Sequence, residues 1–232
     1  MSKLSLIFYW VFFAVLNLKA SEYEITVLAT NTANFGGIGE WSFSALLESD
    51  DEKILFDTGF NENTVLHNAN LLGKDLSQVE KVILSHFHGD HTGGLIKLRK
   101  TFKEINPKAF STVYVADGFF EQRYDENGEL RGFIGGFNDV DNFLKETDEL
   151  GIRFVILKEP IEISKNLYLS GPVERIHERV VVSPGFYLKK DGLLLDDLVL
   201  DDQSLGILTK QGWYMMSGCG HAGMINTEQK FK

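Results

Sequence analysis

The segment His86–His91 constrains the fold of this chain more than any other, because it carries three histidines and an aspartate within six residues. It follows directly on Lys81–Leu84, an apolar run that predicts a short buried strand. In a loop that leaves a strand, alternate side chains point the same way, so His86 and His88 can converge on one metal ion. The segment therefore predicts a metal site at the end of a β-strand.

The second half of this segment can hold a second ion. Asp90 and His91 follow the turn at Gly89 and so face a neighbouring position. Four such side chains packed without a metal would bury several unsatisfied polar groups. Imidazole and carboxylate ligands suit Zn²⁺, Fe or Mn²⁺ better than an ion that prefers thiolates. We expect one or two bound ions, with Zn²⁺ as the first candidate and Fe or Mn as alternatives.

These residues and two other segments resemble the metallo-β-lactamase superfamily, whose HxHxDH motif matches His86–His91 residue by residue. The resemblance runs from about Tyr23 to Asn226 and is most similar to the dihydropterin-ribofuranosylaminobenzene phosphate synthase-like subgroup. The other matching segments are Leu55–Gly59 around Asp57 and Ser217–Gly223 around His221, and Gly39–Trp41 and Asp202–Leu205 favour the subgroup.

The resemblance implies an α/β fold, the four-layer αββα sandwich of the metallo-β-lactamase type, with metals at the open edge between the two sheets. His86, His88 and His221 would hold the first ion. Asp90 and His91 would hold part of the second, and Asp90 would also accept or relay a proton as the catalytic group.

Two further residues have competing interpretations. By resemblance, Asp57 would orient a metal ligand and brace the loop without contacting metal, although an aspartate in an Asp-Thr-Gly turn is as easily a plain turn-former. Cys219 can serve as a ligand in principle, but we expect a small buried residue beside the histidine loop.

The chain departs from the superfamily pattern after His221. Superfamily members continue with a further strand and helix that bring a carboxylate and a last histidine, whereas this chain stops at Lys232. We therefore expect a shortened sandwich that lacks its last elements and an under-coordinated second ion.

Residues 1–20 predict a signal peptide that is removed on export to the periplasm or the medium. Lys3 supplies the positive start, Leu4–Leu16 is apolar, and Ala20 is a small residue at the cleavage position. The apolar run is shorter than the roughly 20 residues that span a bilayer, so no stable membrane anchor is expected. Residues 21–232 then form one domain, with a loop-rich insertion at about 117–150 that ends in a helix.

Residue patterns predict most of the remaining elements. Helices are expected over Asn61–Leu72, Thr92–Thr101 and Val140–Leu150. Strands are expected over Tyr23–Thr30, Trp41–Glu48, Lys53–Phe56, Lys81–Leu84, Thr112–Ala116, Phe154–Leu157, Leu167–Ser170, Val180–Val182, Leu193–Leu195, Ser204–Thr209 and Gly212–Met216.

Composition excludes some classes of partner. The formal net charge of −10 repels a phosphate backbone, so no nucleic acid is expected. The single cysteine allows no intrachain disulfide. We therefore expect a small-molecule substrate as the partner. The sequence does not indicate the oligomeric state.

The function that these features predict is metal-dependent hydrolysis, in which metal-activated water attacks an ester, phosphodiester, thioester or lactam. Two alternatives stay open. The same ligands loaded with iron would support redox chemistry, and a shortened chain could bind metal without catalysis.

Overall fold

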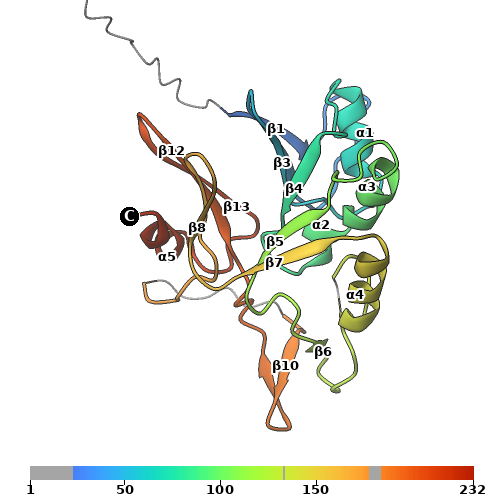
Figure 1. The fold of residues 1–232 in the computed structure, drawn as a ribbon. Helices are drawn as coiled ribbons and strands as arrows, with labels where there is room; N and C mark the ends of the chain where they lie inside the picture. The colour runs from blue at the N-terminus through green and yellow to red at the C-terminus, as the bar shows by residue number, and fades with distance from the viewer. Residues whose placement is uncertain (1–22, 133, 178–183) are drawn as a thin grey trace, which may run out of the picture.

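The computed structural model describes residues 23–132, 134–177 and 184–232. The predicted leader and the strand expected over Val180–Val182 lie outside these residues. Within the described ranges, no helix combines the length and the apolar character needed to cross a bilayer. Two sheets face each other, and helices cover the outer side of each (Figure 1).

The larger sheet has six strands in the order β1-β2-β3-β4-β5-β7. β1, β2 and β3 pair antiparallel, whereas β3, β4, β5 and β7 run parallel. Helices α1, α3 and α4 cover its outer side (Figure 1). The bounds are β1 Glu24–Ala29, β2 Ser44–Glu48, β3 Lys53–Phe56, β4 Val79–Ile83, β5 Thr112–Ala116, β7 Arg153–Leu157, α1 Thr64–Leu71, α3 Leu95–Phe102 and α4 Val140–Glu149.

The central strands β2 and β3 of this sheet are buried on both faces. Leu46, Leu55 and Val82 lie side by side across β2, β3 and β4 and belong to the core beneath the helices. Their chain neighbours Leu47 and Ile54 belong to a second core, which faces the other sheet. Alternate side chains of a strand point to opposite faces, so the continuous apolar runs of the sequence place this sheet in the interior.

The second sheet has the order β13-β12-β9-β8 and carries its own outer layer. Leu205 and Ile207 point into the core between the sheets, while Gly206 faces outward beneath the ring of Phe231. A Cβ at Gly206 would lie 2.6 Å from that ring, so the absence of a side chain lets the C-terminal turn pack closely. The predicted αββα sandwich is therefore confirmed. The bounds are β8 Ile161–Ser164, β9 Leu167–Leu169, β12 Ser204–Thr209, β13 Gly212–Ser217 and α5 Met224–Glu228.

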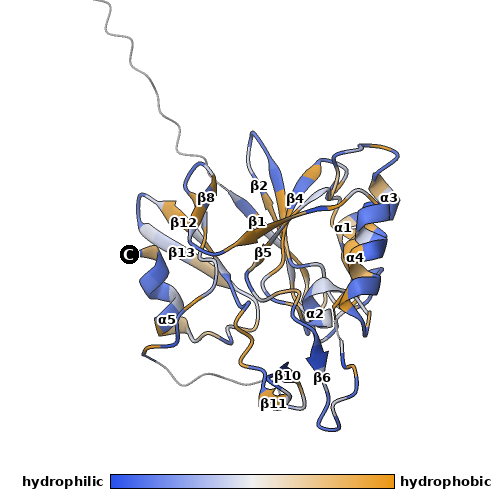
Figure 2. Cartoon of the chain, turned by 60° about the horizontal axis from the view of Figure 1, so that its bottom comes forward, coloured by the Kyte–Doolittle hydropathy of each residue, from blue (hydrophilic) through white to orange (hydrophobic). Residues whose placement is uncertain are grey.

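A small third sheet, in the order β11-β10-β6, lies at one end of the molecule (Figure 2). Its strands are β6 Arg123–Tyr124, β10 Tyr187–Lys190 and β11 Leu193–Asp196. β6 lies in the segment expected to be loop-rich, and its strand conformation depends on pairing with the distant β10.

The sequence patterns found most other elements. β8, β10, α5, the short helix α2 (Gly89–Thr92) and the 3-10 turn at Gln229–Phe231 were not predicted. The strand expected from Trp41 begins only at Ser44, and the helix expected from Thr92 begins only at Leu95. The N–H of Phe43 donates to the carbonyl of Asp90 at 3.4 Å, so the backbone before Ser44 is hydrogen-bonded to the histidine segment.

Leu55→Ala tests the core beneath the helices. Leu55 is completely buried, so we expect the free energy of unfolding to fall by about 3 kcal/mol. Ile25→Ala is the matched control, because Ile25 lies in the same sheet but is 43% exposed, and it should cost less than about 1 kcal/mol. Urea denaturation measures both, and equal losses would contradict this layer assignment.

Candidate metal centre

The histidine segment lies at the carboxyl end of β4, between the parallel strands β3 and β5. The short helix α2 (Gly89–Thr92) turns the chain back over the end of β3. A Cβ at Gly93 would lie 1.9 Å from the carbonyl oxygen of Phe60, and one at Gly94 would lie 2.2 Å from that of Thr58. The absence of a side chain at these two glycines therefore permits the close backbone approach.

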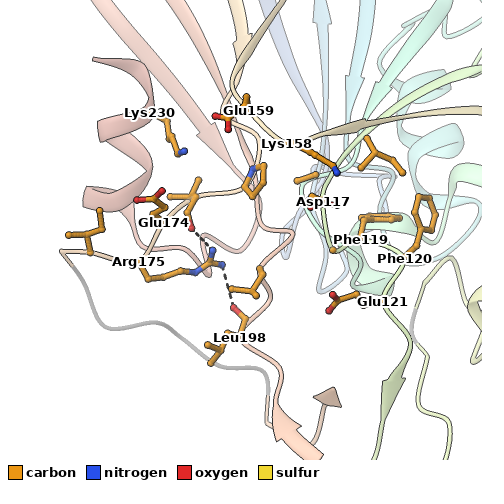
Figure 3. A pocket seen from close by; sticks show the side chains of 17 residues that line it. Asp117, Phe119, Phe120, Glu121, Lys158, Glu159, Glu174, Arg175, Leu198 and Lys230 are labelled. Atoms are coloured by element: carbon orange, nitrogen blue, oxygen red, sulfur yellow. Dashed lines mark hydrogen bonds between the residues drawn. The ribbon is translucent and has the colours of Figure 1, made fainter. Parts of the chain in front are cut away.

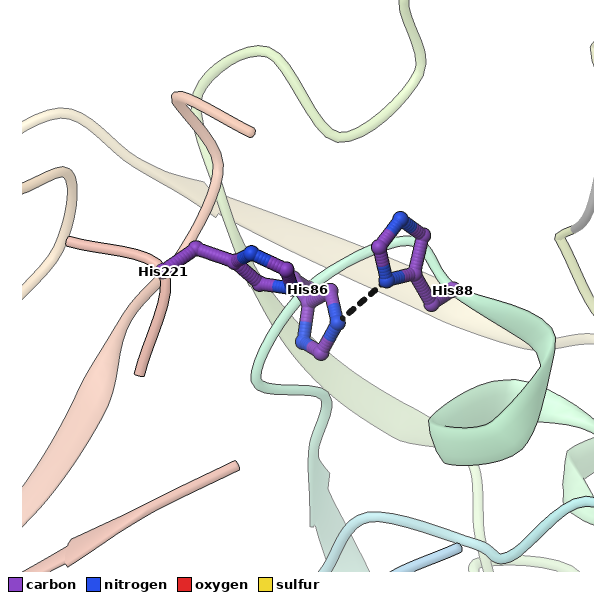
Figure 4. Close-up of side chains that lie close together, drawn as sticks. All are labelled: His86, His88 and His221. Atoms are coloured by element: carbon purple, nitrogen blue, oxygen red, sulfur yellow. Dashed lines mark hydrogen bonds between the residues drawn. The ribbon is translucent and has the colours of Figure 1, made fainter. Parts of the chain in front are cut away.

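His86, His88 and His221 come together on the end of the sandwich, although His221 follows β13 of the other sheet (Figure 4). Nε2 of His86 lies 2.9 Å from Nδ1 of His88. The ring of His221 lies 4.9 Å from that of His86 and 5.1 Å from that of His88, between centres. One ligand nitrogen from each ring lies within 4.8 Å of the ligand nitrogens of the other two rings. All three side chains are buried.

Electrostatics keep two of these rings neutral. Burial, reinforced by the neighbouring histidines, holds the pKa of His86 well below its usual range. Burial and the charge of His221 lower the pKa of His88 to about 3. Neutral imidazoles offer lone pairs, and two ligands on a tetrahedral ion at about 2.1 Å lie roughly 3.4 Å apart, close to the separation of the His86 and His88 nitrogens. The cluster therefore fits a divalent cation.

Asp57 and Ser85 hold two of the rings from behind. The Asp57 carboxylate accepts the backbone N–H of Ser85 at 2.7 Å and its hydroxyl at 2.8 Å. Since the hydroxyl proton goes to Asp57, the 2.9 Å contact between Ser85 Oγ and His86 Nδ1 requires the proton on that nitrogen. Nδ1 of His91 lies 2.7 Å from Asp57 Oδ2 in the same way. Both rings are thus left with Nε2 facing the cluster.

A second group forms beside the first, from His86, His91 and Cys219. Nε2 of His91 lies 3.2 Å from Cys219 Sγ and 3.4 Å from Asp90 Oδ2. The expectation that Cys219 is a buried spacer is wrong, because the residue is exposed and its thiol points at the His91 ring. The end of β13 delivers it there, which its neighbours in the sequence do not reveal.

The pKa values of this second group follow from its mutual contacts. Burial would raise the pKa of Asp90, but hydrogen bonding to His91 and the charge of that ring lower it. Burial would lower the pKa of His91, but the charge and hydrogen bond of Asp57 raise it well above its usual range. Burial would also raise the pKa of Cys219, whereas hydrogen bonds with His221 and His91 lower it. These contacts therefore stabilise the anionic forms of Asp90 and Cys219, which are the forms that bind a metal ion.

The sequence patterns missed a buried ion-pair network behind the loop. Asp201 accepts the N–H of Phe87 at 2.8 Å and pairs with Arg123 at 3.0 Å. Arg123 also pairs with Asp197 at 3.1 Å, and its guanidinium stacks 3.7 Å from the centre of the Phe87 ring. Phe87 lies between the two metal-facing histidines, so the network fixes the backbone that carries them.

Asp202 supports the other side of the centre. Its Oδ2 accepts the N–H of Ala222 at 2.8 Å, next to His221. Burial raises the pKa of this carboxyl to about 6, although the Ala222 hydrogen bond and His221 act to lower it. Asp201 and Asp202 lie at the turn before β12, and each accepts a backbone N–H from a segment that carries metal-facing histidines. In the sequence, the feature that could have indicated this role is a pair of acidic residues directly before an apolar strand.

A cleft of about 890 Å³ opens elsewhere, beside Asp117–Glu121 and Pro172–Ile176 (Figure 3). Lys158, Arg175 and Lys230 line it together with acidic side chains, so it carries both signs of charge. It contains none of the residues that surround the histidines, and the metal centre remains the better candidate for chemistry.

Comparisons with known proteins agree with this fold. The model of the metallo-β-lactamase superfamily matches residues 42–223. A protein of Methanocaldococcus jannaschii named 7,8-dihydropterin-6-methyl-4-(β-D-ribofuranosyl)-aminobenzene-5′-phosphate synthase is 30% identical, over 91% of this chain and 72% of its own. An anti-Pycsar protein of a Paenibacillus species is 32% identical over 53% of this chain and 47% of its own. A solved metal-dependent hydrolase of the β-lactamase superfamily is 29% identical, with a TM-score of 0.67 over 90% of this chain and 70% of that one.

Asp57→Asn tests the carboxylate behind the rings. The amide keeps the size of the side chain but loses the charge that orients His91, so we expect metal affinity to fall by roughly 10- to 100-fold. Asp148→Asn, on the exposed surface of α4, should leave the affinity unchanged. Calorimetric titration with Zn²⁺ measures both, and equal affinities would show that Asp57 is only a turn-former.

Proposed function

Because this chain belongs to the metallo-β-lactamase superfamily, we propose that it is a metal-dependent hydrolase acting on an ester or phosphodiester bond of a small molecule. The observation that carries the proposal is the buried cluster of His86, His88 and His221, two of whose rings are held neutral. Three imidazoles around an open position are typical of catalytic zinc sites. Zn²⁺ is therefore the ion that we propose, with Fe and Mn as alternatives.

The ligands divide into two sets. His86 Nε2, His88 Nδ1 and a nitrogen of His221 would hold the first ion, and His91, Asp90 and Cys219 would hold a second. Ions bound there would supply Lewis acidity and lower the pKa of a coordinated water to about 7.

Side chains of the protein orient the metal ligands and transfer a proton. Asp57 and Ser85 fix the orientation of the His86 and His91 rings, so neither ring has to turn when an ion binds. The Asp90 carboxylate is ionised at neutral pH, because its pKa is lowered, and it would relay a proton released in hydrolysis without retaining it. Burial of all three histidines in the first set excludes bulk water from the ligand atoms.

A bond-forming reaction is the second candidate, since a relative with 30% identity is named a synthase. A panel of 4-nitrophenyl esters, a phosphodiester and a lactam separates the two. Turnover of any member by the metal-loaded chain supports hydrolysis. Failure with every member, at full metal content, would favour the synthase reaction.

We also propose that residues 1–20 direct export. Support comes from the positive start, the short apolar run and Ala20 in the sequence. N-terminal sequencing of the protein after expression in a bacterial host tests this, because export predicts a mature chain that begins at Ser21. A cytoplasmic product that retains Met1 would contradict it.

His88→Ala should remove a ligand of the first ion and abolish turnover. His67→Ala is the matched control, since His67 is an exposed residue of α1 whose ring contacts the carbonyl of Gly36, away from the metal centre. Bound metal is measured by elemental analysis alongside the rate. A His88→Ala protein with full metal content and full activity would refute the ligand assignment.

Cys219→Ser tests the second ligand set by spectroscopy. A thiolate bound to Co²⁺ gives an intense near-ultraviolet charge-transfer band, which a serine hydroxyl cannot produce. We expect the Co²⁺-loaded wild-type chain to show this band and the variant to lose it while keeping the first ion. A spectrum without the band in the wild-type protein would exclude Cys219 as a ligand.

A further inference from the structure

The small sheet β11-β10-β6 reaches the metal centre through one aromatic ring. Phe186, directly before β10, lies 5.5 Å from His88 and 5.8 Å from Phe87, between ring centres. The ring therefore forms a wall beside a residue that faces the metal position. The same ring also contacts Arg131.

Arg131 is held against this wall. Its guanidinium carbon lies 4.6 Å from the centre of the Phe186 ring, and Nη1 donates to the carbonyl of Gly185 at 2.7 Å. Arg131 and His88 thus both lie within 5.5 Å of one ring centre. Stacking on an aromatic face stabilises a cation and fixes the plane of the guanidinium.

The loop that follows Arg131 is tied to the histidine segment at a second point. The N–H of Gly135 donates to Thr92 Oγ1 at 2.7 Å, and this hydroxyl donates to the carbonyl of His88 at 3.0 Å. The position of Arg131 relative to the metal centre is therefore set by contacts on both sides.

The guanidinium keeps an unused binding edge. Arg131 is exposed, and Nε and Nη2 have no hydrogen-bond partner among the described residues. Asp125 is near enough to feel this charge, but its Oδ1 accepts the N–H groups of Asn127 and Glu129. The Nε and Nη2 edge of an arginine is the fork that grips phosphate oxygens in bidentate fashion.

We propose that Arg131 binds a phosphoryl group of the substrate beside the metal centre, which makes the substrate a phosphate ester or phosphodiester. This inference rests on the proposed function and narrows its substrate class. In a chain of net charge −10, a fixed cation at the rim of the site also attracts an anion that the surface as a whole repels.

The test is the affinity of the metal-loaded full-length protein for inorganic phosphate, measured by calorimetry. Arg131→Ala should weaken binding roughly tenfold, because it removes charge-assisted hydrogen bonds. Arg131→Lys should restore only part of the loss, since lysine keeps the charge and lacks the fork. Lys189→Ala is the matched control: Lys189 stacks on Tyr124 in the same sheet, 5.6 Å from the ring centre, and its loss should change affinity less than about twofold.

Kinetics supply the second readout. Arg131→Ala should raise KM for bis(4-nitrophenyl) phosphate, an anion, and leave KM for neutral 4-nitrophenyl acetate unchanged. The protein could bind phosphate through Arg131 and yet turn over none of these substrates. That result would reject the hydrolase function but support the anion site at Arg131. An unchanged phosphate affinity in Arg131→Ala, an equal loss in Lys189→Ala, or no phosphate binding by the wild-type protein would overturn the proposal.

Discussion

The buried carboxylate of Asp57 is the contact on which the rest of the centre depends. Asp57 directly follows β3 and has a left-handed backbone conformation, with a φ of 56°. Its carboxylate makes three contacts, two with Ser85 and one with His91. Ser85 in turn contacts His86. The end of β13 packs on the same pair, because a Cβ at Gly218 would lie 2.2 Å from Ser85 Oγ and 3.2 Å from Asp57 Oδ2. Contacts from both sheets thus stabilise the left-handed backbone of Asp57. The same contacts fix the positions of the metal-facing nitrogens of His86 and His91.

Around this contact, each sheet contributes one half of the centre. The parallel strand β4 delivers His86 and His88, and the hairpin β12–β13 delivers Cys219 and His221. The apolar core between the sheets fixes their relative position, while two buried acids at the start of β12 tie that hairpin to Phe87 and Ala222. Burying charged groups is costly unless they are paired and hydrogen-bonded, and here the cost is offset by contacts that set the ligand geometry.

The features that could be predicted from the sequence are those that depend on residues close together in the chain. The spacing of His86, His88 and His91 after a strand predicted a metal site, whereas the sandwich and the contribution of His221 came from the resemblance to the metallo-β-lactamase superfamily. The pairing of Arg123 with Asp201 and of Asp201 with Phe87 joins residues 78 and 114 positions apart, so no local pattern carries it. Cys219 was misinterpreted for the same reason, because its exposure depends on where β13 ends.

The most direct measurement is X-ray absorption at the metal edge of the natively purified protein. The account predicts a bound ion whose first shell contains nitrogen at about 2.0 to 2.1 Å, with the outer-shell scattering of imidazole rings. A shell made only of oxygen ligands, or a protein that retains no metal, would contradict it.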